Sequence, residues 1–374
     1  MNILIITLKD PGIDPRPYKQ IMSLSKNHTI TVVGRKKITH PGVVSYEISY
    51  RMSYLNLFVF FILNQMRLYD RSYRIFSKTR SLYMVEKKLL ETDFDWIITH
   101  DIDTLPFAMD IKKNAKLILD SHEYSPRQHD NLIMDLLFKK FRVYFFNKYL
   151  KKCDLMLAVS EGIAEEYLKN FGVSPLVITN ASPYKELSPR PVDPEHIRII
   201  HHGDTSPARK LEKMIDVMNY TEPRFSLYFM LIKTDTDYLK TLIKMAENMN
   251  NVHFIDPVPM NRIVDTINQY DIGLYLLEPY SFNALMALPN KIFEFVQARL
   301  AIVIAPAPEM AYLVKKYNLG VVTDDFLPGS MATLLNSLTA EDIQYFKEQS
   351  NRSAYILSSE KNDEILSDYL NKSR

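Results

Sequence analysis

The 374-residue sequence predicts an α/β protein made of two doubly wound, Rossmann-like domains in series. Short β-branched runs alternate with longer helical stretches, which is typical of parallel sheets covered by helices. A proline-rich segment, with four prolines between residues 181 and 196, interrupts this alternation. The alternation then starts again, so we expect a second domain and a ligand cleft between the two.

Twelve runs are expected to be strands. In the first half they are residues 3–7, 29–34, 96–99, 116–120, 155–160 and 176–179, and in the second half residues 197–203, 226–232, 252–255, 272–277, 301–305 and 320–323. The expected organisation is an N-terminal domain (1–185), a linker (186–196), a C-terminal domain (197–345) and a C-terminal helical segment (346–374) that packs across both domains.

The composition and the absence of certain motifs exclude several classes of protein and kinds of site. Cys153 is the single cysteine, which excludes a multi-cysteine metal site and favours a reducing, cytoplasmic location. No GxGxxG motif follows the first strand and no GxxxxGK[ST] motif occurs, which argues against dinucleotide cofactors and P-loop kinases. We expect no signal peptide, and the longest apolar run, residues 54–63, is shorter than the roughly 20 residues of a membrane span.

Charge is unevenly distributed along the chain. Residues 1–190 hold 28 Lys and Arg against 20 Asp and Glu, whereas residues 191–374 hold 18 against 24. A basic half indicates an anionic surface or substrate as partner, and no nucleic acid is expected. Residues 54–80 and 130–152 are basic and amphipathic, which suits core helices with basic rims or peripheral contact with an anionic membrane. Their basic residues include Lys139, Lys140 and Arg142.

Polar side chains follow two expected strands of the first half. His100 and Asp101 follow one strand, and His122 and Glu123 follow the next. Ligands of open parallel sheets bind at these strand ends. A histidine there can bond to a sugar hydroxyl or move a proton, although a structural role in a turn is the alternative. Asp101 and Asp103 are also spaced to share a cation, but aspartate commonly caps such loops.

A loop and helix start in the second half are suited to a diphosphate. Gly203 ends an expected strand, and Arg209 and Lys210 are expected in the first turn of a helix that starts near Ala208. Basic residues there oppose the helix macrodipole, a cost that a bound anion would offset. The alternative is a solvated basic turn.

The stretch "LPNKIFEF", residues 288–295, is expected to begin another helix at Pro289. Lys291 and the helix-start N–H groups near Asn290 would favour phosphate oxygens, and Glu294 could accept hydrogen bonds from a ribose diol. A surface ion pair between Lys291 and Glu294, worth about 0.2–0.5 kcal/mol, is the alternative. It fits less well because the neighbouring residues are apolar.

These stretches, in this order, resemble the GT-B glycosyltransferases of family 4, which are retaining enzymes with nucleotide-sugar donors. The motifs are the loop Asp14-Pro15-Arg16, "THDIDTLP" (99–106), "DSHE" (120–123), "VSEGIAEEY" (159–167), "HHGDTSPARKLEKMI" (201–215) and "ALPNKIFEF" (287–295). The resemblance extends over nearly the whole chain, and "LPNK" marks a branch of the family.

The resemblance implies roles for individual residues. Arg209 would hold the donor diphosphate, Glu294 matches the second glutamate of the family's Glu-x7-Glu motif and would bind the donor ribose, and Val258 lies where the base is contacted. His122 matches the acceptor-side histidine and, with Arg209 and Lys291, forms the expected catalytic set. The donor-binding set is completed by Gly203, Lys210, Asn290 and Lys291, and the acceptor side by Arg16, His100, Asp101 and Glu123.

Three positions depart from the family pattern. Met286 stands where the first glutamate of the motif is expected, Arg299 stands in place of a glycine, and Lys210 often corresponds to a glycine. Lys291 or backbone amides would then replace the contacts of the missing glutamate.

We therefore expect a metal-independent, retaining hexosyltransferase without a cofactor. It would move a sugar from a UDP- or GDP-linked donor to a glycan or lipid-linked glycan, as in bacterial surface polysaccharide synthesis at the inner face of the cell membrane. Three alternatives remain open at this point: a metal-dependent transferase that uses Asp101 and Asp103, a sugar-nucleotide 2-epimerase of similar fold, and a catalytically inactive glycan- or membrane-binding relative.

Overall fold

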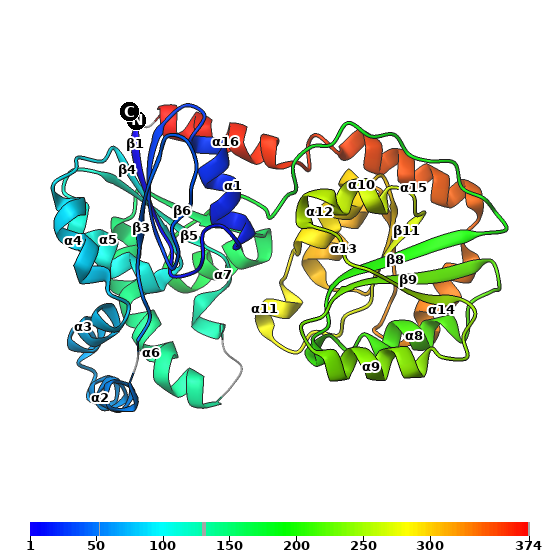
Figure 1. The fold of residues 1–374 in the computed structure, drawn as a ribbon, viewed down its shortest axis with the longest axis horizontal. Coiled ribbons are helices and arrows are strands. Elements are labelled where there is room, and N and C mark those ends of the chain that lie inside the picture. The colour runs from blue at the N-terminus through cyan, green and yellow to red at the C-terminus, as the bar shows by residue number, and fades with distance from the viewer. Residues whose placement is uncertain (52, 129–131, 373–374) are drawn as a thin grey trace. The chain divides into compact units, whose positions relative to one another are not determined.

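The computed structural model describes residues 1–51, 53–128 and 132–372, with side chains from residue 138 onward in the last range. The chain forms two compact units (Figure 1), one of Met1–Ile178 with Ser281–Asn283 and one of Thr179–Tyr280 with Ala284–Arg374. Each unit contains one parallel sheet, which confirms the predicted class of two doubly wound α/β folds. The first unit ends at Ile178, before the predicted boundary at residue 185.

The sheet of the first unit has the strand order β3-β2-β1-β4-β5-β6-β7, with every pair parallel. The strands are β1 (Asn2–Ile6), β2 (Thr29–Gly34), β3 (Val43–Glu47), β4 (Trp96–His100), β5 (Lys116–Ser121), β6 (Leu155–Ala158) and β7 (Leu176–Val177). The sequence prediction missed β3 because this edge strand is only half buried and lacks a continuous apolar run.

The helices of the first unit are α1 (Pro15–Leu24), α2 (Tyr54–Gln65), α3 (Tyr69–Thr79), α4 (Leu82–Leu90), α5 (Leu105–Ile111), α6 (Leu132–Tyr149) and α7 (Glu161–Phe171). An aromatic cluster joins α2, α3 and α6. The ring of Phe60 lies 5.2 Å from that of Phe141 and 6.3 Å from that of Phe76. The basic amphipathic stretches therefore form core helices on this side; residues 130 and 131 lie outside the described part. No helix in the described residues is long and apolar enough to span a membrane.

The sheet of the second unit has the order β10-β9-β8-β11-β12-β13, again with parallel pairs. The strands are β8 (Ile197–Asp204), β9 (Phe225–Ile232), β10 (Val252–Ile255), β11 (Ile272–Tyr275), β12 (Ala301–Ile304) and β13 (Gly320–Val322). The helices are α8 (Glu212–Met218), α9 (Thr236–Met245), α10 (Ile263–Ile267), α11 (Phe282–Leu285), α12 (Asn290–Gln297), α13 (Pro308–Lys316), α14 (Pro328–Ser337), α15 (Ala340–Ser353) and α16 (Ser359–Lys372).

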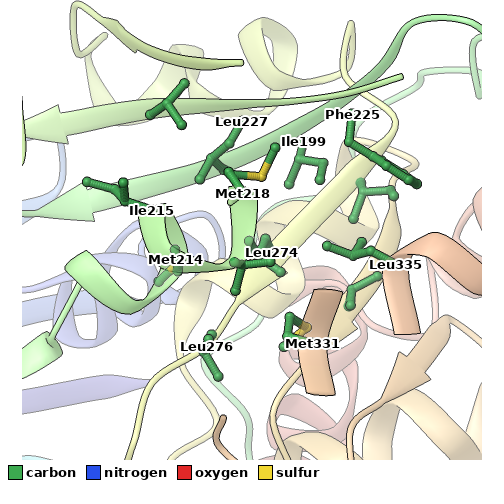
Figure 2. Close-up of a cluster of buried hydrophobic side chains, with 14 of the residues drawn as sticks. Ile199, Met214, Ile215, Met218, Phe225, Leu227, Leu274, Leu276, Met331 and Leu335 are labelled. Atoms are coloured by element: carbon green, nitrogen blue, oxygen red, sulfur yellow. The ribbon is translucent and has the colours of Figure 1, made fainter. Parts of the chain in front are cut away.

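The side chains of successive residues in these strands face alternately toward two hydrophobic cores, one on each side of the sheet. Ile199 and Leu274 face the core that α8, α9 and α14 cover, which Figure 2 shows from within. Their neighbours Ile200 and Tyr275 face the opposite core, under α10, α12 and α13. This is the period-two alternation of a strand buried on both faces, and it explains the continuous apolar runs in the sequence.

Helix α15 is attached to the sheet by a buried ion pair. Lys347 Nζ lies 2.9 Å from Asp271 Oδ1 and donates a second hydrogen bond, of 3.1 Å, to the carbonyl of Tyr270. The two charged side chains are 0% and 2% exposed. That helix 346–374 crosses between the domains stays a prediction.

Arg299 stands at the position where the resemblance predicted a glycine, and the structure shows how the arginine is accommodated. Its backbone is left-handed, with φ 61°, a conformation that glycine adopts at less cost. The buried guanidinium donates to the carbonyls of Lys185 and Gln297, each at 2.6 Å, and to Asn351 Oδ1 at 2.7 Å. These charge-assisted bonds stabilise the strained position.

Replacement of Lys347 by methionine tests the ion pair. The variant leaves the carboxylate of Asp271 buried without its cation, and we expect a loss of about 3–5 kcal/mol in the free energy of unfolding, measured by urea denaturation. The matched control is K240M, because Lys240 and its partner Asp237 form an exposed pair at 3.1 Å. That variant should leave the midpoint unchanged. Equal midpoints for K347M and the wild type would contradict the structural role.

Candidate functional site

Three cationic or conformationally special residues meet at the carboxyl end of the sheet in the second unit. Gly203 is the second-last residue of β8, and its φ is 130°. A Cβ atom built on Gly203 would lie 2.5 Å from Lys291 Nζ and 3.6 Å from an Nη atom of Arg209. The missing side chain of Gly203 leaves room for the Lys291 amine, and the φ of 130° disfavours any residue with a side chain at this position. The sequence prediction that these three residues share one site is consistent with this geometry.

Lys291 is a buried amine in a cationic neighbourhood. Its side chain is 7% exposed, and Nζ lies 5.4 Å from the centre of the Tyr275 ring. Burial and, after it, the charge of Arg209 lower the pKa of Lys291 to about 7, while Asp204 and Glu294 act in the opposite direction. Within the described residues, the amine has no hydrogen bond or ion pair. It is thus poised to take up an anion.

Arg209 reaches the same place from a short turn. Residues Pro207–Arg209 form a 3-10 helix, and Arg209 Nη2 lies 2.6 Å from Asp204 Oδ1, with both side chains about one-third exposed. This ion pair holds the guanidinium beside Gly203. Because the pair is partly in water, an incoming phosphate can compete for the guanidinium.

Glu294 lies one turn after Lys291 on α12. Its Oε2 atom is 3.4 Å from Nε2 of His202, which is 4% exposed at the side chain. Burial lowers the pKa of His202 to about 3, with the charges of Lys291 and Arg209 acting in the same direction, so this histidine is neutral. The neutral ring of His202 does not compensate the charge of the Glu294 carboxylate.

The expected helix start at Arg209 and Lys210 is wrong. Lys210 has φ 47°, and α8 begins only at Glu212. Lys210 Nζ pairs instead with Glu278 Oε2 at 2.8 Å, and Lys213 pairs with the same oxygen at 2.9 Å. These lysines lower the pKa of Glu278 to about 2. The macrodipole argument for an anion at this helix start therefore does not apply.

The structure also gives the positions of the other residues predicted to bind the donor. Asn290 is the first residue of α12, and Pro289 is its N-cap rather than its first helical residue. Val258 follows β10 and packs against one of the two cores. Tyr275 was missed, because a tyrosine that ends an apolar strand has the same sequence signature as a core residue. Asp204 was visible only as one polar residue of a loop.

In the first unit, a buried carboxylate organises the strand ends. Asp120 is 0% exposed, and its Oδ1 receives Arg16 Nη2 at 2.6 Å and Nε at 2.8 Å. Burial disfavours its charge, but Arg16, His100 and His122 hold the pKa of Asp120 well below its usual range. Arg16 also donates to the carbonyl of Ile178 at 2.7 Å. Arg16 is thus buried and serves to position Asp120, which corrects the prediction that it lines the acceptor side.

Two histidines continue from Asp120 toward the surface. His100 Nδ1 lies 3.8 Å from Asp120 Oδ2 and 2.8 Å from His122 Nε2. Burial lowers the pKa of His100 to about 4, so it is neutral at neutral pH. His122 is 12% exposed at the side chain, and its Nδ1 lies 4.0 Å from Asp14 Oδ2. His122 is therefore the outer end of a hydrogen-bonded series and can exchange a proton with a ligand.

The acidic residues around the histidines have different partners. Asp101, with φ 63°, accepts a hydrogen bond from the backbone N–H of His122 at 3.1 Å. Asp103 accepts two hydrogen bonds from Arg142, at 3.0 and 2.8 Å. Burial, with the charge of Asp101, raises the pKa of Glu123. The two aspartates are engaged separately, which argues against one cation shared between them.

A different trio has the composition of a metal site. His100, Asp120 and His122 offer ligand atoms that all lie within 4.8 Å of one another. A cation there would have to break the hydrogen bond between the histidines and compete with Arg16 for Asp120. The carboxylate of Asp120 and the facing nitrogens of the two histidines are therefore already engaged within the protein, and they fit a proton-exchanging network better than a resident metal.

The charges around Lys291 predict the direction in which its pKa shifts when each of them is removed. R209Q removes the cation that disfavours a second positive charge and should raise the pKa of Lys291, whereas D204N should lower it. Competitive acetylation of the amine as a function of pH, followed by peptide mass spectrometry, measures both shifts. A wild-type pKa near 10.5, or shifts in the same direction for the two variants, would contradict the site geometry.

Comparison with known proteins shows which proteins the chain is similar to. Residues 23–181 match the model of Glycosyltransferase Family 4, and no curated protein gives a significant sequence match. Among solved structures, Anabaena HepE in complex with UDP and glucose matches at TM-score 0.67 and 15% identity, with 100% of each chain covered. Sucrose-phosphate synthase from Thermosynechococcus elongatus matches at 0.71 and 11%, covering 100% of this chain and 98% of that one.

A third match is trehalose-phosphate synthase from Burkholderia multivorans, at TM-score 0.66 and 11% identity, covering 100% of this chain and 96% of that one. At these identities the structural likeness concerns the fold. The resemblance to family 4 is confirmed over the residues that its model matches. The chain has the GT-B fold, and its residues 23–181 are similar to Glycosyltransferase Family 4.

Proposed function

We propose that the protein transfers a sugar from a nucleotide-sugar donor to a glycan or lipid-linked glycan, with retention of anomeric configuration and without a metal. One observation carries the proposal: Arg209 and the buried amine of Lys291 converge on the bare backbone of Gly203. This is a dense positive site beside a position where a ligand can approach the backbone. HepE, which shares the fold, has been solved with UDP-glucose, and this supports a UDP-linked donor here.

In the proposed reaction, negative charge grows on the diphosphate as its bond to the sugar breaks. Arg209 and Lys291 stabilise this charge from fixed positions, which is the most effective form of electrostatic catalysis. A diphosphate raises the pKa of Lys291, so the amine is fully protonated once the donor is bound. Glu294 accepts hydrogen bonds from the donor ribose and fixes the nucleoside.

His122 is proposed to contact the acceptor hydroxyl. Its ring is oriented by the hydrogen bond with His100, which in turn lies beside the buried Asp120. The acceptor proton can pass to the departing phosphate oxygen, with His122 holding the hydroxyl in place. His122 would thus raise the rate of transfer without being required for donor binding.

The donor assignment makes a quantitative prediction. E294Q should weaken binding of UDP-glucose or of whichever UDP- or GDP-sugar binds best by about 1–3 kcal/mol, as expected for a hydrogen bond to a charged group. Isothermal titration calorimetry measures this. E341Q, at an exposed position in α15, is the matched control and should bind as the wild type does. Unchanged affinity in E294Q would remove Glu294 from the donor site.

Product analysis separates the alternatives. Formation of an epimerised nucleotide-sugar without acceptor would support the 2-epimerase, and loss of transfer in EDTA would support the metal-dependent transferase. A protein that neither transfers nor hydrolyses any donor, with R209A indistinguishable from wild type, would be the inactive relative. The proposal requires a transferred sugar with the donor's anomeric configuration, observed by NMR in EDTA.

Peripheral contact with an anionic membrane at the inner face of the cell membrane is proposed for α2. Its outer face carries exposed apolar side chains at four-residue spacing: Tyr54, Phe58, Ile62 and Met66 are 94%, 60%, 38% and 62% exposed. Lys139 and Lys140 on the neighbouring α6 are exposed and would meet anionic headgroups. Arg142, grouped with them from the sequence, is instead buried against Asp103.

The membrane proposal predicts that F58S reduces flotation with vesicles containing phosphatidylglycerol, because it removes a large apolar group from the contact face. Y312S is the control, since Tyr312 is 55% exposed in the second unit. An equal reduction in both variants, or none in F58S, would argue against α2 as the contact.

A further inference from the structure

A cavity of about 250 Å³ opens at the carboxyl end of the first sheet, apart from the histidine series. Its walls come from residues that follow four strands. Leu8 follows β1, Arg35 follows β2, Tyr50 follows β3 and Asp103 follows β4, with Ile48, Ser49 and Arg80 completing the lining. Loops at this edge of an open parallel sheet are where ligands bind. No residue of the cavity has a role in the donor chemistry above.

Two arginines of this cavity lie close to the ring of Tyr50. The guanidinium carbon of Arg35 lies 6.0 Å from the centre of the Tyr50 ring, and that of Arg80 lies 4.9 Å from it. Arg80 also stacks on Phe76 at 3.3 Å. The aromatic faces hold the planar guanidinium groups by cation–π contact and leave their N–H edges directed elsewhere.

Neither arginine forms an ion pair in the part of the chain that the structure describes, and the charge of Asp103 acts on Arg80 only from beyond ion-pair distance. Arg80 uses Nη1 for hydrogen bonds to the carbonyl of Phe76 and to Thr79 Oγ1, both 3.3 Å long. Arg35 has Tyr50 as its side-chain contact. The lining carboxylate, Asp103, is bound by both ends of the Arg142 guanidinium, so its charge is already compensated. The cavity therefore carries an excess of about two positive charges.

The charge and size of the cavity indicate its ligand. Arginine forks match phosphate oxygens, and two uncompensated guanidinium groups suit a dianion better than a single carboxylate. At about 250 Å³ the cavity is below the roughly 300–1,000 Å³ of pockets that enclose a whole small molecule. It is thus suited to one substituent of a larger ligand.

We propose that the cavity bounded by Arg35, Tyr50 and Arg80 binds a phosphate group of the acceptor, which is therefore a lipid-linked phosphate. The lipid source follows from position: Tyr50 lies four residues before Tyr54, where the exposed apolar face of α2 begins. A phosphate in the cavity would have its alkyl chain next to this face. The identification of the ligand as an acceptor rests on the proposed transferase function.

Methyl NMR of Leu8 and Ile48, which line the cavity, tests the proposal on the full chain. Octyl phosphate, used below its micelle concentration, should shift both signals saturably. It should bind with a lower dissociation constant than inorganic phosphate or glucose 1-phosphate. R35Q should weaken its binding at least tenfold. K37Q is the matched control, because it removes the same charge from an exposed position two residues away.

Binding of octyl phosphate that is unchanged in R35Q, or reduced equally in K37Q, would overturn the site. Equal binding of octanoate would overturn the preference for phosphate, and tighter binding of glucose 1-phosphate would overturn the lipid source. The outcome is independent of the donor site. If UDP binds and E294Q weakens it while octyl phosphate leaves Leu8 and Ile48 unshifted, the transferase proposal stands and this one fails; the reverse pattern would retain the cavity and reject the transferase.

Discussion

A charge that is buried away from water needs a partner, and the packing of helices on the sheet within each unit depends on this constraint. In the first unit Asp120 is completely buried, and Arg16 reaches it from α1, more than a hundred residues earlier in the chain. In the second unit Asp271 at the start of β11 is met by Lys347 from α15. Each pair attaches a helix to a parallel sheet. Lys291 is the contrasting case, since it is buried close to another cation, and this unfavourable position is where a ligand charge would be most stabilising.

The parts of the fold that local sequence decides were predictable. Strand β2 begins and ends as predicted, because an apolar run buried on both faces has clear limits. The partly buried edge strand β10 also has its predicted bounds, because its residues still form a short apolar run. The edge strand β3 was not predictable in this way, since partial burial leaves it without an apolar run. The turn at Lys210 was also missed, because a left-handed residue without glycine has no sequence signal.

The candidate site was predictable as far as strand ends and motif order allow. The sequence singled out Gly203, Arg209, Lys291 and Glu294. In the structure, the side chains of Lys291 and Arg209 both lie close to the backbone of Gly203. The sequence could not show that Arg16 binds Asp120 rather than a ligand. The two residues are distant along the chain, and each lies near a position where a ligand could bind. The same reasoning applies to Arg142, whose charge suggested a surface and whose carboxylate partner, Asp103, lies in another motif. Basic composition therefore overstates how much positive charge the first unit presents to solvent.

The contact between Gly203 and Lys291 has a consequence for how the protein can change over generations. Every amino-acid replacement at position 203 adds at least one carbon atom, which would lie 2.5 Å from Lys291 Nζ, and the φ of 130° strains any residue that has a side chain. The amine is the end of a flexible side chain and can move, but it then leaves the place beside Gly203. A replacement at position 203 therefore disturbs both the backbone and the position of Lys291, so the two positions are expected to change together.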